Sequence, residues 1–399
     1  MARTAVGVIG AGIIGLAVAR RLLEVTPDTS VVVIDKEASV AAHQSGHNSG
    51  VVHAGLYYPP NSLKADLCGR GRNQIRIYCA EQGLPYTECG KLVIARDEEE
   101  IGRLHRIERR ARLNRVPDLA WVDATRIALI EPHATGAAAL HSPHTAIVDF
   151  AAVARSFADD VRRAGGSVEL GRRVTEIATR NDGVAVQAGG DELVFDHLVV
   201  CAGLQSDRLA RLAGDRDDPV IVPFRGEYLR LVPSRTDLVR GLIYPVPDPA
   251  YPFLGVHFTR RIDGGVDIGP NAVLALAREG YRRRDMNPAD MWDIVRSPGF
   301  RRLAGRHWRT GAREMLGSVS TQAFLASARR FVPELSAADV ERAPAGVRAQ
   351  AVEPDGTLLD DFRIGRVGRV VTVRNAPSPG ATSSMAIADR IVGEWLMVS

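Results

Sequence analysis

The sequence lacks the features that mark membrane, secreted and nucleic-acid-binding proteins. No run of residues approaches the roughly 18 consecutive apolar residues of a membrane helix, and no basic and apolar leader opens the chain. The formal charge is +4, but acids and bases alternate and no long block of like charge occurs. We therefore expect a cytoplasmic protein with no nucleic-acid partner.

Cysteine and lysine are also scarce. Lysine supplies only three of the 51 basic residues, an arginine bias that we attribute to genome composition. The four cysteines, none of them in a CxxC pair, are Cys68, Cys79, Cys89 and Cys201. His43, His47 and His53 lie on a glycine-rich loop that offers few carboxylates, and no HExxH pattern occurs. We expect neither disulfides nor a metal site.

The chain begins with the pattern of a dinucleotide-binding βαβ unit. It reads AVGVIGAGIIGLAVARRLLE and then VVVID: an apolar strand, Gly10, Gly12 and Gly15, an amphipathic helix, and a second strand ending at Asp35. Gly10 permits a tight turn, Gly12 lets a pyrophosphate approach the backbone, and Gly15 allows close helix packing. Asp35 stands where a ribose-binding carboxylate is expected. A glycine-rich turn before an ordinary helix is the alternative, and the motif alone does not separate FAD from NAD.

The next segment, HQSGHNSGVVHAGLYY at residues 43–58, favours FAD. A nicotinamide dehydrogenase usually continues with further simple α/β units, whereas here a loop rich in His, Ser, Asn and Gly follows the acid. Backbone amides and short polar side chains suit a flavin's pyrophosphate and ring edge. A solvated polar loop is the alternative, but VVHAGLYY is too apolar to lie comfortably in water.

At 399 residues the chain should form about two domains. We predict an α/β (α+β overall) fold in which a Rossmann-like FAD-binding domain carries an inserted substrate domain with a mixed, largely antiparallel sheet. The FAD-binding domain is predicted to be discontinuous, with the pieces 1–85, 148–218 and 345–399. The substrate-binding domain is predicted from 86–147 and 219–344, with helical stretches over 288–330.

Two later segments return to the predicted nucleotide domain. A β-meander is predicted over the segments SVEL, RRVTEIATR and GVAVQAG. It is followed by the strand LVVCAG, which ends at Ala202 and Gly203. The last return is a strand, a Pro- and Gly-rich loop at residues 377–380, and a closing helix capped by Thr382 or Ser383. That helix can direct its positive end toward reduced flavin. The predicted cofactor contacts are Gly10, Gly12, Ile14, Gly15, Asp35, Lys36, Gln44, Ser45, Asn48, Ser49, Gly50, Val51, Val174, Ala202, Gly203, Gly380, Ala381, Thr382 and Ser383.

Several motifs together resemble the L-2-hydroxyglutarate dehydrogenase/oxidase family. They are the GxGxxG start, HQSGHNSGVVHAGLYY, CGKLVIA, PFRGEYLRL, the run YPVPDP to GPNAVLA, PAGVRAQAV followed by DG, and NAPSPGATS. The resemblance spans essentially the whole chain. The family it points to belongs to the wider D-amino-acid oxidase and glycerol-3-phosphate dehydrogenase group of FAD enzymes. It implies FAD-dependent oxidation of L-2-hydroxyglutarate to 2-oxoglutarate. The FAD should be non-covalent, because no cysteine occupies a recognised attachment motif.

Oxidation of a 2-hydroxy acid requires a base for the hydroxyl proton and cationic groups for each carboxylate. His53 is the first candidate base, because it lies on the flavin loop and the resemblance implies the role; His257 is the second, and either histidine could instead be structural. The resemblance implies that Arg348 binds the α-carboxylate, a task that suits a planar guanidinium. The candidates for the distal carboxylate, which we do not rank, are Tyr57, Lys91, Arg225, Tyr244 and Arg260.

Two other functions stay open on the sequence. One is an FAD oxidase or dehydrogenase of another small 2-hydroxy acid or an amino acid, and the other is a non-catalytic FAD-binding scaffold. We expect a quinone or oxygen to accept the electrons. We also expect at most peripheral contact with the inner face of the cell membrane, because the basic charge balance suits an anionic surface.

Overall fold

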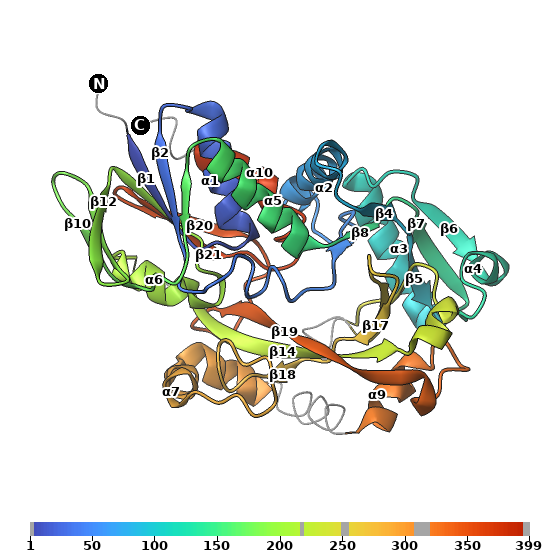
Figure 1. Cartoon of the computed structure of the whole chain (residues 1–399). Helices are drawn as coiled ribbons and strands as arrows, with labels where there is room; N and C mark the ends of the chain where they lie inside the picture. The colour runs from blue at the N-terminus through green and yellow to red at the C-terminus, as the bar shows by residue number, and fades with distance from the viewer. Residues whose placement is uncertain (1–3, 216–218, 249–254, 307–319, 394–399) are drawn as a thin grey trace.

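A computed structural model describes residues 4–215, 219–248, 255–306 and 320–393. Within these residues the strands form a six-stranded sheet, a nine-stranded sheet and two three-stranded sheets (Figure 1). Parts of two predicted features, residues 249–254 of the long YPVPDP run and 307–319 of the helical stretch, lie outside the described residues.

The six-stranded sheet carries the βαβ unit. Its order is β20 (Arg363–Val367), β21 (Val370–Asn375), β13 (His197–Val200), β1 (Ala5–Ile9), β2 (Ser30–Ile34) and β9 (Ser167–Glu169). All neighbours pair in parallel except β20, which is antiparallel to β21. The central strands are continuous apolar runs because both faces of a parallel sheet are covered.

Helices cover one face of this sheet and a small antiparallel sheet covers the other (Figure 1). The helices are α1 (Ile13–Val25), α5 (Phe150–Arg163) and α10 (Ser384–Ile391), and the small sheet is β10 (Val174–Thr179), β11 (Val184–Ala188) and β12 (Asp191–Phe195). Along β1 the side chains alternate, so that Val8 packs with the helices and Ile9 with the small sheet.

One detail of the predicted meander is wrong. Residues 167–169 form β9, a parallel edge strand beside β2, whereas the meander itself is β10, β11 and β12. The reason is that α5 packs against α1 and then returns the chain to the edge of the parallel sheet.

The nine-stranded sheet forms the other half of the molecule, and the long strands β14 and β19 run beneath the nucleotide half (Figure 1). Its order is β18 (Val273–Leu274), β14 (Val220–Leu231), β17 (Val266–Gly269), β16 (His257–Arg260), β15 (Leu242–Pro245), β5 (Lys91–Ala95), β7 (Ala138–Ser142) and β6 (Ala120–Asp123), with β19 (Val340–Val352) paired to β14. The pairs are antiparallel except β15 with β5. The predicted fold class is confirmed.

The remaining elements connect or flank the two large sheets. They are the small sheet of β3 (Val51–Val52), β8 (Ala146–Val148) and β4 (Tyr86–Glu88), and the helices α2 (Leu63–Glu81), α3 (Glu98–Leu113), α4 (Ala124–Ile130), α6 (Ser206–Leu212), α7 (Pro288–Arg296) and α9 (Thr321–Ala328). Strand β19 crosses the predicted boundary at residues 344 and 345, and the division into two domains stays a prediction. In the described ranges, no helix is both long enough and apolar enough to span a bilayer.

Candidate active site

The glycine-rich turn between β1 and α1 is built by close backbone contacts. Gly10 has φ +110°, and a Cβ there would lie 2.3 Å from the carbonyl oxygen of Cys201. A Cβ on Gly15 would lie 2.0 Å from the carbonyl oxygen of Gly10, so only glycine lets α1 approach the turn. Gly12 differs: its φ is −78°, and a Cβ there would meet only the Ser45 hydroxyl, at 3.3 Å. At Gly12, therefore, only the Ser45 hydroxyl would have to move to accommodate a side chain.

Asp35 fastens the end of β2 to this turn. One carboxylate oxygen accepts the backbone N–H of Ala11 at 2.6 Å, and the other accepts that of Glu37 at 2.9 Å. Asp35 thus lies at the edge of the turn, where a ribose is predicted to bind.

The flavin loop, residues 43–58, is held against the first turns of two helices. Ser45 Oγ accepts the N–H of Ile13, the first residue of α1, at 2.9 Å. Thr382, which lies just before α10, accepts the N–H of His53 at 3.2 Å and donates to the carbonyl of Val51 at 3.3 Å. Segments more than 300 residues apart in the sequence therefore meet at this loop.

A cavity of about 520 Å³ lies at this meeting point. The predicted cofactor residues that line it are Gly10, Gly12, Ile14, Asp35, Lys36, Gln44, Ser45, Asn48, Ser49, Val51, Val174, Ala202, Gly203, Gly380, Ala381 and Thr382. Gly15, Gly50 and Ser383 are not among the lining residues. Ser383 is the residue before α10, as one of the two predicted caps, but its side chain makes no capping hydrogen bond. The cofactor contacts of all these residues stay predictions.

The two candidate bases are both neutral at physiological pH, and His257 is buried whereas His53 is half-buried. Burial lowers the pKa of His53 to about 3, with smaller contributions from the charges of Lys91 and His257. His53 lines the cavity, and its Nε2 lies 3.3 Å from Ser378 Oγ. Burial likewise lowers the pKa of His257 to about 3. His257 Nδ1 lies 2.9 Å from the Gly255 carbonyl, so it carries the proton and leaves Nε2 as an acceptor.

Arg348 also lines the cavity, on β19 opposite Phe224 of β14. Its positive charge lowers the pKa values of His257 and Tyr244, so Arg348 lies near the second candidate base. Arg225 and Arg260, the candidate arginines for the distal carboxylate, contact protein oxygens. Arg225 donates to the Arg282 carbonyl and to Glu227, and Arg260 donates to the carbonyls of Thr236 and Val239. Neither of these lines the cavity.

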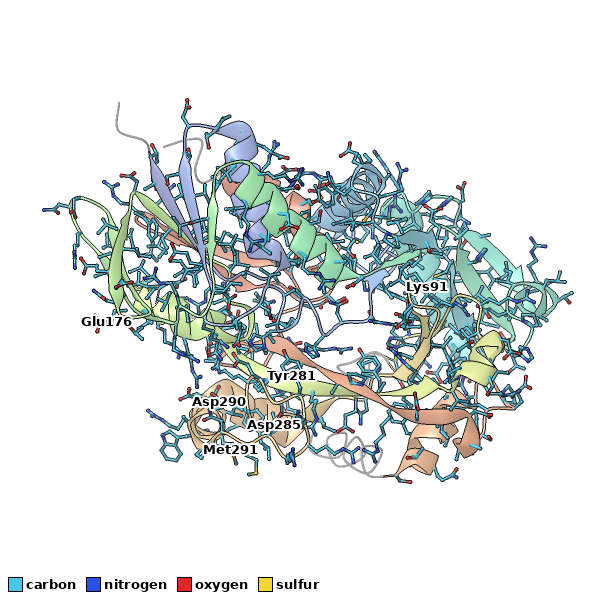
Figure 2. The ribbon with its side chains drawn as sticks, viewed as in Figure 1. Lys91, Glu176, Tyr281, Asp285, Asp290 and Met291 are labelled. Carbon is cyan, nitrogen blue, oxygen red and sulfur yellow. The ribbon has the colours of Figure 1, made fainter. Side chains whose placement is uncertain are left out.

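Tyr57, Lys91 and Tyr244 form a separate group near His257, in which Lys91 and Tyr244 are buried and Tyr57 is half-buried. Tyr244 stacks on His257 with ring centroids 4.0 Å apart, and the Lys91 ammonium lies 3.7 Å from the Tyr244 ring centroid. Figure 2 shows Lys91 inside the half of the molecule formed by the nine-stranded sheet, with Tyr281 lying toward the centre of the view. None of these three candidates lines the cavity itself.

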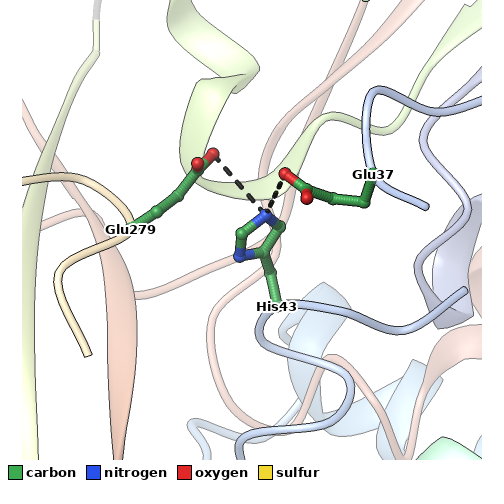
Figure 3. Close-up of side chains that lie close together, drawn as sticks. All are labelled: Glu37, His43 and Glu279. Carbon is green, nitrogen blue, oxygen red and sulfur yellow. Dashed lines mark hydrogen bonds and ion pairs between the residues drawn. The ribbon is translucent and has the colours of Figure 1, made fainter. Parts of the chain in front are cut away.

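The flavin loop also contacts a segment that contains none of the predicted site residues. Tyr281 stacks on His47 with ring centroids 4.1 Å apart, and Glu279 lines the cavity. In Figure 3, Glu37 and Glu279 approach His43 from two sides. Their ligand atoms are close enough to hold a metal ion, but the Lys36 ammonium lies 2.9 Å from Glu279 and 3.1 Å from His43 Nε2. A lysine already supplies the cation there, so we assign no metal.

Hydrogen bonds from Lys36 and His43 lower the pKa of Glu37 to about 2, so this carboxylate stays ionised.

Sequence analysis did not name Ser378 as a site residue, although it recognised the Pro- and Gly-rich loop that contains Ser378. No local pattern marks Glu279 or Tyr281, because their role depends on the fold bringing the segment after β18 to the loop.

Comparison with known proteins identifies the family. The model of the DAO family, described as FAD dependent oxidoreductase, matches residues 5–394. The human mitochondrial L-2-hydroxyglutarate dehydrogenase is 45% identical over 404 residues, covering 97% of this chain and 87% of the human protein. The L-2-hydroxyglutarate dehydrogenase of Escherichia coli K12 is 42% identical over 388 residues, covering 97% and 92%.

Solved structures show the same fold. An FAD-bound L-α-glycerophosphate oxidase from Mycoplasma pneumoniae superposes with a TM-score of 0.78 at 22% identity, covering 98% of this chain and 94% of that one. Glycine oxidase from Geobacillus kaustophilus gives a TM-score of 0.72 at 18% identity, covering 97% and 93%. The resemblance found in the sequence is confirmed. The chain belongs to the DAO family of FAD-dependent oxidoreductases and, within it, to the group of the L-2-hydroxyglutarate dehydrogenases.

Proposed function

We propose that this enzyme oxidises L-2-hydroxyglutarate to 2-oxoglutarate with non-covalently bound FAD. One observation carries the proposal beyond the sequence identity: Arg348 and His53 line the same cavity as the glycine-rich turn and the loop before α10. A carboxylate-binding cation and a neutral proton acceptor therefore border the space in which a flavin would lie. These are the groups that oxidation of a 2-hydroxy acid requires.

The residues present suit FAD. The cavity lies within the size range of small-molecule sites, and Gly12 presents backbone without a side chain to it. Among the described residues, the buried hydroxyls of Ser383 and Ser384 have no hydrogen-bond partner, and both stand at the start of α10. We propose that the glycine-rich turn and Asp35 hold the adenosine and pyrophosphate part, and that the flavin loop and the start of α10 hold the flavin.

The roles of the protein groups follow from charge and protonation. Arg348 would donate two parallel hydrogen bonds to the α-carboxylate and so fix the direction of the Cα–H bond. His53, or His257 in its place, would take the hydroxyl proton, because each is neutral and can accept it. Bound FAD supplies the two-electron acceptor for the hydride that leaves Cα.

Anaerobic bleaching of the flavin tests the proposal. L-2-Hydroxyglutarate should reduce the flavin far faster than its D enantiomer, L-lactate, L-malate, glycerol 3-phosphate or D-amino acids. Equal rates with lactate and 2-hydroxyglutarate would instead favour an oxidase of general 2-hydroxy acids. Acid or heat should release intact FAD into the supernatant, and flavin that stays with the precipitate would contradict non-covalent binding.

We further propose that a quinone accepts the electrons in preference to oxygen, in a cytoplasmic enzyme with at most peripheral membrane contact. The word dehydrogenase in the names of the relatives and the positive net charge support this. The measurement is steady-state turnover with oxygen alone and then with a soluble quinone analogue. Full turnover on oxygen with stoichiometric peroxide would show an oxidase and remove the membrane link.

A further inference from the structure

Lys91 is a buried lysine that forms no ion pair with any of the residues that the structure describes. Its side chain is at the start of β5, and the residue is only 2% exposed. The contacts found for its ammonium, within the described part of the chain, are the rings of Tyr244 at 3.7 Å and Tyr57 at 4.7 Å. Tyrosine faces attract a cation, but they do not replace the hydrogen bonds that an ammonium loses on leaving water.

The hydroxyl of Tyr57 beside it is in a similar state. This oxygen is buried, and among the described residues it has no hydrogen-bond partner. Burial raises the pKa of Tyr57 well above its usual value, so the hydroxyl remains a donor. Unpaired buried donors are rare in native proteins and disfavour folding, so the Tyr57 hydroxyl, on a ring 4.7 Å from the Lys91 ammonium, is explained if a ligand accepts its hydrogen bond.

The strand register places this group next to the candidate catalytic residues. Leu242 of β15 pairs with Lys91 of β5, and Tyr244 is two residues further along β15, so it lies on the same face as Leu242. Continuing the antiparallel pairing of β15 with β16 brings Tyr244 opposite His257, and the two rings are stacked. The charges of Lys91 and Arg348 both reach His257. Two cations therefore approach one histidine from different strands.

We propose that Lys91, Tyr57 and Tyr244 form the subsite that binds the distal carboxylate of a dicarboxylate substrate, and that Lys91 sets the preference for dicarboxylates. The inference rests on the proposed function, because it takes the α-carboxylate to lie on Arg348. The ammonium and the Tyr57 hydroxyl offer one donor to each oxygen of a carboxylate. The Tyr244 ring contacts both the Lys91 ammonium and the His257 ring, so it connects this subsite to the second candidate base.

Burial also affects the charge of Lys91. It lowers the pKa of Lys91 to about 7, so that much of the lysine is uncharged at neutral pH. The titratable groups whose rings or charges act with Lys91 are Tyr57, Tyr244, His53, His257 and Cys68. A bound carboxylate would favour the charged ammonium, so ligand binding should be accompanied by proton uptake.

The first test compares two substrates in one variant. L-2-Hydroxyvalerate carries a methyl group where L-2-hydroxyglutarate carries the distal carboxylate. In Lys91→Met holoenzyme, the preference for 2-hydroxyglutarate in flavin reduction should fall by about 100-fold or more, because the anion has lost its buried partner. The rate with 2-hydroxyvalerate should stay the same or rise. Loss of both rates together would show that Lys91 supports the reaction generally, and would overturn the subsite.

The second test does not require oxidation. Glutarate and valerate are titrated into wild-type holoenzyme and followed by the flavin absorbance spectrum. Glutarate should bind more tightly, and Lys91→Met should abolish the difference. If glutarate binding depends on Lys91 while L-2-hydroxyglutarate is not oxidised, the proposed function fails and the subsite stands. Equal binding of glutarate to wild type and Lys91→Met overturns the subsite.

Two further variants cover the case in which Lys91→Met does not fold. Tyr57→Phe removes only the unpaired hydroxyl, and should weaken the binding of glutarate without weakening that of valerate. Unchanged glutarate affinity would count against the subsite.

Lys64→Met is the matched control, because Lys64 is also buried but pairs with Asp360 at 2.7 Å. It should leave the glutarate-to-valerate ratio unchanged, and a loss equal to that of Tyr57→Phe or Lys91→Met would show that the effect is not specific to the subsite.

Discussion

Substitution of Gly12 should separate FAD binding from folding. Gly12 has φ −78° and stands just before α1, a conformation that alanine adopts without strain. An added Cβ would meet only Ser45 Oγ, at 3.3 Å. The apoprotein of Gly12→Ala should therefore keep its stability to within about 1 kcal/mol. The same Cβ protrudes where a pyrophosphate would contact the backbone, and loss of such contacts should weaken FAD by about 2 to 4 kcal/mol, or roughly 30- to 700-fold in Kd.

Gly15→Ala is the contrasting variant. Its Cβ would lie 2.0 Å from the carbonyl oxygen of Gly10, a backbone atom that cannot move aside without opening the turn. We expect this variant to lose about 3 kcal/mol of folding free energy as well as its flavin. The assays are flavin content after purification, FAD titration of the apoprotein, and urea unfolding of both apoproteins. The reasoning is refuted if Gly12→Ala binds FAD like wild type, or if its apoprotein is as unstable as Gly15→Ala.

Three further predictions concern the substrate site. Arg348→Ala should keep FAD but lose about 2 to 4 kcal/mol of transition-state binding, seen as a fall in kcat/KM, with a smaller loss in Arg348→Lys; unchanged kcat/KM in both would remove Arg348 from substrate binding. His53→Ala should slow flavin reduction, whereas wild type should keep its base from pH 8 down to pH 5 because the pKa of His53 is near 3; if only His257→Ala is slow, the two roles must be exchanged. Glutarate affinity should fall as pH rises through the pKa of Lys91, about 7, by up to about tenfold per pH unit, because the uncharged amine no longer attracts the anion; a flat profile in a pH titration would contradict this.

The turn and the flavin loop could be predicted because their requirements are local. A positive φ at Gly10 and the close approach at Gly15 demand glycine at fixed spacing, which a sequence displays directly. A mixed, largely antiparallel sheet was likewise predicted within residues 219–344, and β14 to β17 belong to that sheet. The placement of residues 167–169 failed because the strand's neighbour is decided by how α5 packs on α1, and no local pattern records that packing.

The candidates for the distal carboxylate show where local reasoning ends. Arg225 and Arg260 are arginines like any other in the sequence, and no local pattern shows that protein oxygens accept hydrogen bonds from their guanidinium groups. Lys91 stands apart only after β5 pairs in parallel with β15, which brings a lysine and a tyrosine separated by about 150 residues onto one face of the sheet. A side chain becomes a binding group when the fold buries it and leaves its hydrogen bonds unmet, and that condition depends on pairing between distant strands.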